Sequence, residues 1–204
     1  YVQMNTDADK PVPSFASLVG REEHKLCFDT LHPFEYARQI TVITSEMFRR
    51  IRLYEMLLWS NGEKDGCGNI LEAQRFFNGL QNHFSRMILT QSMLKKRIEI
   101  VEKLIQIAQY CYEFHNFDTV MCITLLFETS AIHRLARTFD ALSTKAKEML
   151  TKLTELSRPD NNRLALRTAT SSMVGKPTVP YIGLILSDLT FTNFGNKTKE
   201  SKDR

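Results

Sequence analysis

The side chains that could perform covalent chemistry lie far apart in this sequence and match no catalytic motif. The five histidines stand singly, and the chain has no phosphate-binding G-x-x-x-x-G-K, no G-x-S-x-G and no H-E-x-x-H. His83 and His115 are expected at helix ends or on the surface, and the adjacent Glu22 and Glu23 are expected to be solvated. The sequence therefore predicts a protein that is not an enzyme in the sense of making or breaking covalent bonds.

The cysteines give no sign of a metal site. Cys27, Cys67, Cys111 and Cys122 form no C-x-x-C pair, so neither a zinc site nor a disulfide framework is predicted, and a reducing cytoplasmic setting fits best. No metal or cofactor is expected.

No apolar run approaches the ~20 residues that cross a bilayer. The net charge of +4 is too small, and too mixed with acidic residues, to indicate nucleic-acid binding.

The most distinctive segment lies near the carboxyl end of the chain. Between Thr178 and Phe191 the sequence is almost uncharged, with Asp188 as its single acidic residue, and a strongly charged run follows from residue 197. A segment of this composition is suited to insertion into a partner.

Helical periodicity dominates the part of the chain that must position this segment. Pro33 suits a first helical turn, and an apolar face then recurs for about four to five turns. Its members are Phe34, Ala37, Ile40, Thr41, Phe48 and Ile51. The glycine-rich segment from Ser60 to Gly68 predicts a loop, after which Asn69 is expected to cap a helix through Thr90.

The clearest amphipathic stripe runs from Met93 to Tyr112 through Leu104, and it predicts a core helix. The apolar block from Val120 to Phe127 has the length of a strand, but no turn chemistry brackets it, so a buried helix is expected.

Helix signals continue toward the end of the chain. Ser143 is expected to cap a helix that runs to Leu156, and Pro159 stops it. With no convincing strand and no internal repeat, the predicted fold class is all-α, an irregular helical bundle in a single domain. Residues 1–20 are expected to be a leader or linker, residues 21–196 the domain, and residues 197–204 a charged tail.

Four blocks in the chain, taken in order and spacing, resemble the catalytic domain of the Ras-family guanine nucleotide exchange factors. The blocks are residues 31–41, residues 107–118, residues 130–139 and residues 179–196. The resemblance covers roughly residues 28 to 196. It implies the same fold class with a projecting helical hairpin, and a function in promoting GDP release from a Ras, Rap or Ral type small GTPase.

In this family the hairpin displaces the switch I segment of the GTPase and crowds the magnesium and phosphate positions, with no covalent step. The resemblance implies no cofactor, no nucleic-acid partner and no oligomer. It implies a cytoplasmic protein that reaches the membrane periphery only through its lipidated partner.

The resemblance also assigns roles to individual residues. The first hairpin helix is expected from about Tyr181 to Phe194, with the partner contacted by Tyr181, Ser187, Thr190, Phe191 and Phe194. Leu184, Leu186 and Leu189 are expected to seat this arm on the bundle. Arg38, Glu128 and Asn162 match positions that contact the partner elsewhere in the family.

The chain departs from the family pattern at several positions. Phe194 precedes Gly195-Asn196 where a carboxylate is common, Glu128 stands where asparagine is usual, and Asn162 stands where an aromatic is common. The returning hairpin arm and the final helix of the family are not recognised before Arg204, and an excerpt of a longer protein is favoured over a degenerate domain. The alternative function is a small-GTPase-binding or scaffold domain that keeps the fold without exchange activity.

Overall fold

The computed structural model describes residues 28–200 of the chain. The expected leader, the first residues assigned to the domain, 21–27, and residues 201–204 lie outside the described part. Within residues 28–200 the secondary structure is helical, and no strand forms, which confirms the predicted all-α class. The helices are α2 (Pro33–Arg50), α3 (Leu53–Ser60), α4 (Gly68–Leu89), α5 (Leu94–Glu113), α6 (Phe117–Glu128), α7 (Ser130–His133), α8 (Ala136–Asp140), α9 (Thr144–Ser157), α10 (Asp160–Ser171) and α11 (Ile182–Glu200).

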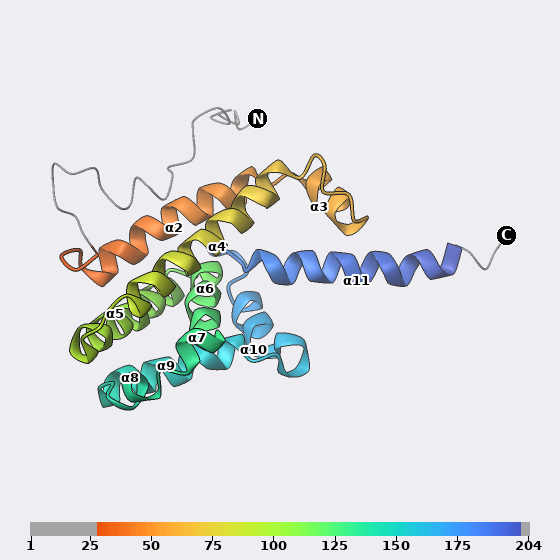
Figure 1. Ribbon diagram of the computed structural model, residues 1–204. Helices are drawn as coiled ribbons and strands as arrows, with labels where there is room; N and C mark the ends of the chain where they lie inside the picture. The colour runs from red at the N-terminus through yellow and green to blue at the C-terminus, as the bar shows by residue number, and fades with distance from the viewer. Residues whose placement is uncertain (1–27, 201–204) are drawn as a thin grey trace, which may run out of the picture.

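Helices α5 and α6 form the centre of the bundle, with α2, α4 and α9 packed around them (Figure 1). The stripe predicted on α5 is buried, and Leu104 within it has no exposed surface. The block from Val120 to Phe127 is a buried helix, as predicted, because it lies inside α6 and only Leu125 in it is partly exposed.

The buried side chain of Asn116 joins the start of α6 to α2. Its Oδ1 accepts a hydrogen bond from the backbone N–H of Thr119 (3.1 Å), which caps α6. Its Nδ2 donates to the hydroxyl groups of Thr41 and Thr44 on α2, at 3.0 Å in both cases. Every polar atom of this buried amide side chain therefore has a partner, as burial requires.

The predicted helix caps have different outcomes. Ser143 caps α9 as expected, since its hydroxyl accepts a hydrogen bond from the backbone N–H of Ala146 (3.3 Å). The prediction that Asn69 caps α4 is wrong, because α4 begins at Gly68 and the Asn69 backbone N–H donates to the carboxylate of Glu55 (2.8 Å). A buried acid from α3 thus satisfies the first turn of α4.

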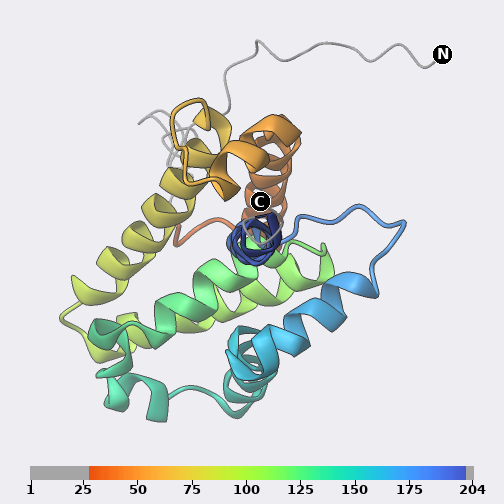
Figure 2. The same ribbon diagram turned by 90° about the vertical axis from the view of Figure 1, so that its right-hand side faces the viewer.

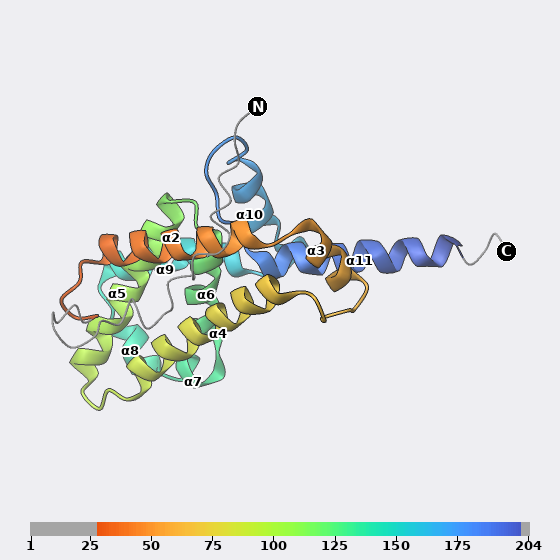
Figure 3. The same cartoon turned by 90° about the horizontal axis from the view of Figure 1, so that it is seen from above.

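Helix α11 extends away from the bundle, with its far end beyond all the other helices (Figures 1 and 3). Viewed along its axis, it lies between the α2–α3–α4 side of the molecule and α10 (Figure 2). The helix continues to Glu200, beyond the end that was expected near Phe194. The described residues therefore contain one projecting arm.

Candidate functional site

The base of α11 is tied to the junction between α5 and α6. The backbone N–H of Val179 donates to the carbonyl of His115 (3.0 Å), and the Phe117 N–H donates to the Val179 carbonyl (2.9 Å). His115 adopts a left-handed backbone with φ of 57° at this junction, and its Nδ1 lies 3.2 Å from the Pro177 carbonyl. The segment before α11, residues 172–181, hereafter the connecting segment, is thereby fixed to the core.

Apolar side chains seat the first turns of α11 on the bundle. Ile182 and Leu186 are buried in a cluster with Cys67 and Ile70, against which Trp59 packs. Leu184 packs against a second cluster, formed by Phe117, Met121 and Leu166. The seating role predicted for Leu184 and Leu186 is confirmed, and Leu189 is half-buried.

Two polar contacts hold α11 further along its length. The guanidinium of Arg167 on α10 donates two hydrogen bonds to the Asp188 carboxylate, at 2.7 and 2.6 Å. The Asn193 side-chain amide donates to the Ser60 carbonyl and to Asn61 Oδ1, both at 2.8 Å, at the end of α3. Helices α10 and α3 therefore brace α11 from different sides.

A stripe of α11 is left uncovered between these two braces. It consists of Ser187, Thr190, Phe191 and Phe194, whose spacing of three and four residues puts them on one face of a helix. We call it the exposed stripe, because Phe191 and Phe194 are 73% and 64% exposed. Beside it lies a hollow of about 250 Å³, which Trp59 of α3 and Gln74 of α4 also line.

Tyr181 is separate from the exposed stripe. It lies just before α11, half-buried, with its ring 5.8 Å from that of Phe77 on α4, and burial raises the pKa of its phenol. A Cβ atom at Gly183 would lie 2.6 Å from this ring, so any larger residue there would force the Tyr181 ring to shift. Sequence reasoning missed Gly183, although a lone glycine in an apolar helix is a signal of close packing.

Arg38 is exposed on α2 and already paired. Its guanidinium donates two hydrogen bonds to Glu35, at 2.8 and 2.7 Å, and Gln39 donates a third at 2.6 Å. The hydrogen bonds from Arg38 and then from Gln39 lower the pKa of Glu35 to about 2. The part of α2 that approaches α11 is its carboxyl-terminal half, around Met47, so Arg38 is not brought to the exposed stripe.

Glu128 and Asn162 both make hydrogen bonds at the junction between α9 and α10. Glu128 accepts a hydrogen bond from the Ser157 hydroxyl (2.6 Å), and the Ser157 carbonyl accepts one from Arg163. Asn162 is exposed, in a left-handed turn from Asn161 to Arg163, and its carbonyl accepts a hydrogen bond from Arg167 Nε (2.7 Å). Arg167, which the sequence did not single out, thus connects this junction to α11.

The described part of the chain offers no group of three or more His, Cys, Asp or Glu side chains that could hold a metal ion. Among its helices, none has the length and apolarity needed to span a bilayer. What the geometry presents is a braced helix with an apolar and hydroxyl-bearing stripe. These features define a class of all-α domains in which one helix projects from the bundle.

The comparison with known families identifies the domain itself. The family model described as RasGEF domain matches residues 35–204, and the chain belongs to this family. The match includes the whole of the projecting helix and nearly all of α2.

Curated relatives agree with this assignment. The chain is 33% identical over 189 residues to Cell division control protein 25 of Saccharomyces cerevisiae, covering 91% of the chain and 12% of that protein. It is 32% identical over 169 residues to Guanine nucleotide exchange factor SDC25 of the same species, covering 80% and 14%. It is 27% identical over 194 residues to Ras guanine nucleotide exchange factor M of Dictyostelium discoideum, covering 93% and 21%. The chain thus spans a small part of the length of the relatives it matches.

Proposed function

We propose that this domain is a guanine nucleotide exchange factor for a Ras-family small GTPase. The observation that carries the proposal is the exposed stripe on a helix that projects from the bundle and is braced at several points. Membership of the RasGEF domain family supports the same reaction.

The proposed reaction is a displacement cycle in which no covalent bond changes. A small GTPase that holds its nucleotide with a picomolar dissociation constant does so with roughly 16 kcal/mol, so spontaneous release is slow. Helix α11 would displace the switch I segment that closes over the nucleotide. Linkage makes this effect reciprocal. The exchange factor would weaken nucleotide binding to the GTPase by some factor, and bound nucleotide would weaken binding of the exchange factor by the same factor.

The composition of the exposed stripe favours a steric mechanism. Phe191 and Phe194 present rings, and Ser187 and Thr190 present hydroxyl groups, so the stripe carries no carboxylate that could repel a phosphate. Thr190 already donates its hydroxyl proton to the Leu186 carbonyl (2.8 Å). Apolar contact by the two rings would therefore supply most of the force that opens the nucleotide site.

The partner surface would extend beyond α11. We assign Tyr181 to it at the base of the helix, and Arg38, Glu128 and Asn162 at its periphery. The partner would be of the Ras, Rap or Ral type. The domain would act in the cytoplasm as a monomer, without nucleic acid, and meet the membrane through its lipidated partner.

Release of fluorescent GDP from a panel of Ras, Rap and Ral proteins tests the proposal. We expect the domain to accelerate release from at least one of them, and Phe191→Ala to lower that acceleration by roughly tenfold, since a ring buried in an interface contributes on the order of 1–2 kcal/mol. Val174→Ala is the matched control, because Val174 is 86% exposed and lies outside the exposed stripe. No acceleration with any member of the panel would contradict the proposal.

A second candidate function is a GTPase-binding or scaffold domain without exchange activity. It is favoured by Phe194, which stands at a position where a carboxylate is common in the family. This alternative predicts that a GTPase binds the domain and releases GDP at its intrinsic rate. The same panel separates the two candidates when binding and release are measured together.

A further inference from the structure

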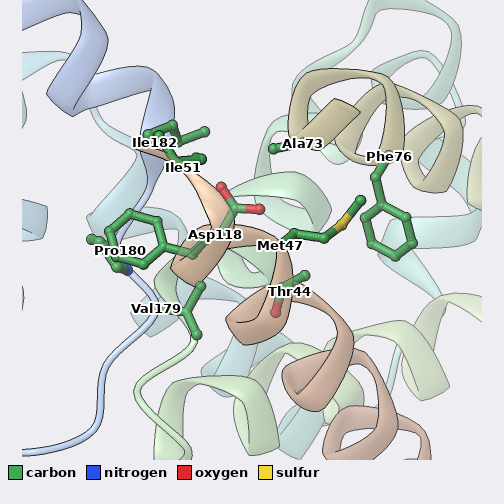
Figure 4. Close-up of a pocket in the computed structure, with 10 residues that line it drawn as sticks. Thr44, Met47, Ile51, Ala73, Phe76, Asp118, Val179, Pro180 and Ile182 are labelled. Atoms are coloured by element: carbon green, nitrogen blue, oxygen red, sulfur yellow. The ribbon is translucent and has the colours of Figure 1, made fainter. Parts of the chain in front are cut away.

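Asp118 lies beneath the first turn of α11, at the wall of a largely apolar cavity (Figure 4). Its carboxylate lies between the side chains of Ile51 and Ile182 on one side and those of Met47 and Ala73 on the other. It is the only ionisable residue among the ten that line the cavity. The cavity leaves about 20 Å³ open, which is room for one water molecule.

The hydrogen bonding of Asp118 is incomplete. The backbone N–H of Ile182, the first residue of α11, donates to this carboxyl group. The other oxygen, Oδ1, is buried and has no hydrogen-bond partner among the described residues. The amino-terminal end of a helix favours a negative charge, whereas burial with an unpartnered oxygen disfavours it. The protonation state of Asp118 therefore affects how well the base of α11 fits the bundle.

We propose that Asp118 is a positioning residue for α11, and that loss of its proton loosens the seating of the helix that carries the exposed stripe. The effect on seating is a property of the domain alone. Its consequence for nucleotide exchange rests on the proposed function.

Linkage gives the direction of the effect. Burial raises the pKa of Asp118 from 3.8 to about 7, and the hydrogen bond from Ile182 opposes this rise only in part. The carboxyl group thus binds its proton more tightly when α11 is seated than when water reaches the cavity. Ionisation must then favour the less seated arrangement by the same free energy. Helix α11 is held more firmly on the acid side of neutrality.

The other titratable groups around Asp118 come from three elements. Cys122 lies one turn further along α6, and Tyr181 lies in the connecting segment; burial raises the pKa of both, so both stay neutral near pH 7. The positive charge of Arg163 on α10 lowers the pKa of Tyr181, against the larger effect of burial. The cavity residues from α2 and α4 carry no ionisable group. His115 also lies near the base of α11, at the α5–α6 junction, where its Nδ1 is 3.2 Å from the Pro177 carbonyl.

Trp59 provides a built-in reporter for the test. It is the single tryptophan of the chain, and it packs against the cluster that holds Ile182 and Leu186. We expect its fluorescence to follow a one-proton transition near pH 7 when the whole chain is titrated from about pH 6 to about pH 8. Asp118→Asn should abolish this transition, and His115→Asn should preserve it, because asparagine tolerates the left-handed backbone of His115. A transition that survives Asp118→Asn, or disappears in His115→Asn, would overturn the proposal; thermal melting of each variant verifies that it is folded.

A second readout connects seating to exchange. With a responsive GTPase, stimulated GDP release should fall roughly fivefold between about pH 6 and about pH 8 in the natural sequence, after correction for intrinsic release, and stay level in Asp118→Asn. Equal pH profiles for the two proteins would overturn the link to exchange. If no GTPase responds at any pH, the proposed function fails, and the Trp59 titration still decides the role of Asp118.

Discussion

The residues of the exposed stripe differ in what each can contribute to a partner. The rings of Phe191 and Phe194 expose most of their surface, so their burial in a complex would be favourable by on the order of 2 kcal/mol each. Ser187 is exposed and its hydroxyl remains available for a new hydrogen bond at small desolvation cost, whereas Thr190 is half-buried with its proton already donated. Affinity is thus expected from the rings, and selectivity from Ser187.

A residue-scale prediction concerns Asp118 and the stability of the domain. The unfolded carboxyl group has a pKa near 3.8 and the folded one a pKa of about 7, so between these values the folded state binds more protons. Stability must then decrease as the pH rises toward 7, by at most about 4 kcal/mol in total, and Asp118→Asn should remove this decrease. Urea denaturation across this pH range measures it, with Asp160→Asn, an exposed acid on α10, as the control. The Asp118→Asn curve is subtracted from that of the natural domain. If the remaining free energy of unfolding rises with pH over this interval, the assignment is wrong.

At the scale of elements, α11 depends on its neighbours for its orientation. Ile182 and Leu186 in its first turns are buried, and beyond Leu189 the Asn193 side-chain amide holds it to the end of α3. Arg167 meets both the carbonyl of Asn162 and the carboxylate of Asp188. The left-handed turn at the start of α10 therefore helps to set the direction of α11.

The element-scale prediction is a charge exchange between α10 and α11. Asp188→Arg alone should place two cations together and reduce exchange, and adding Arg167→Asp should restore part of it, with a coupling of about 1 kcal/mol because both side chains are partly exposed. Exchange rates and Trp59 fluorescence in all four proteins, at low and high salt, give the measurement. The same exchange at Arg158 and Glu155, an exposed pair at the end of α9, should change neither readout. Strictly additive effects at Arg167 and Asp188 would show that the pair does not orient α11.

The sequence predicted the long helices better than the short ones. Helices α2 and α5 have a sustained apolar period, α6 is a continuous apolar block, and α4 and α9 follow a loop or a cap signal, all of which are local properties. The short helices α3, α7 and α8 were not identified, because one or two turns give too few repeats of an apolar period. Helix α10 was not identified either, and it begins with the left-handed turn from Asn161 to Arg163. The start of α4 was predicted wrongly for another reason. Its first turn is capped by Glu55, which accepts a hydrogen bond from the Asn69 backbone N–H and lies fourteen residues earlier in the chain.

At the scale of the whole molecule, the bundle is a platform for α11. Its core is a continuous set of buried side chains from α2, α4, α5, α6 and α9. Leu104 lies inside this set with no exposed surface, in the middle of the central helix α5. The position of the projecting helix therefore depends on a core that the proposed partner never touches.

The prediction at this scale is that Leu104→Asp destabilises the whole domain. It would bury an unpaired charge and leave a cavity, so we expect a loss on the order of 4 kcal/mol. Leu94→Asp is a matched control in the same helix, since Leu94 is 37% exposed and an acid near a helix amino terminus is favourable. Thermal and urea unfolding measure both variants. An unchanged melting temperature for Leu104→Asp would place the core elsewhere.

The sequence by itself determined the all-α class, the core stripe of α5 and the apolar character of the segment that became α11. It also carried the family resemblance that the RasGEF domain match confirms. These features depend on composition and on spacings of three and four residues, which a single helix reveals without its neighbours.

Only the tertiary structure decided which face of α11 stays uncovered, that Arg167 pairs with Asp188 across twenty-one residues, and that Asp118 lies in a cavity beneath Ile182. Each of these depends on where separate helices meet. Packing of the whole bundle fixes these contacts between helices, and no local period in the sequence specifies them.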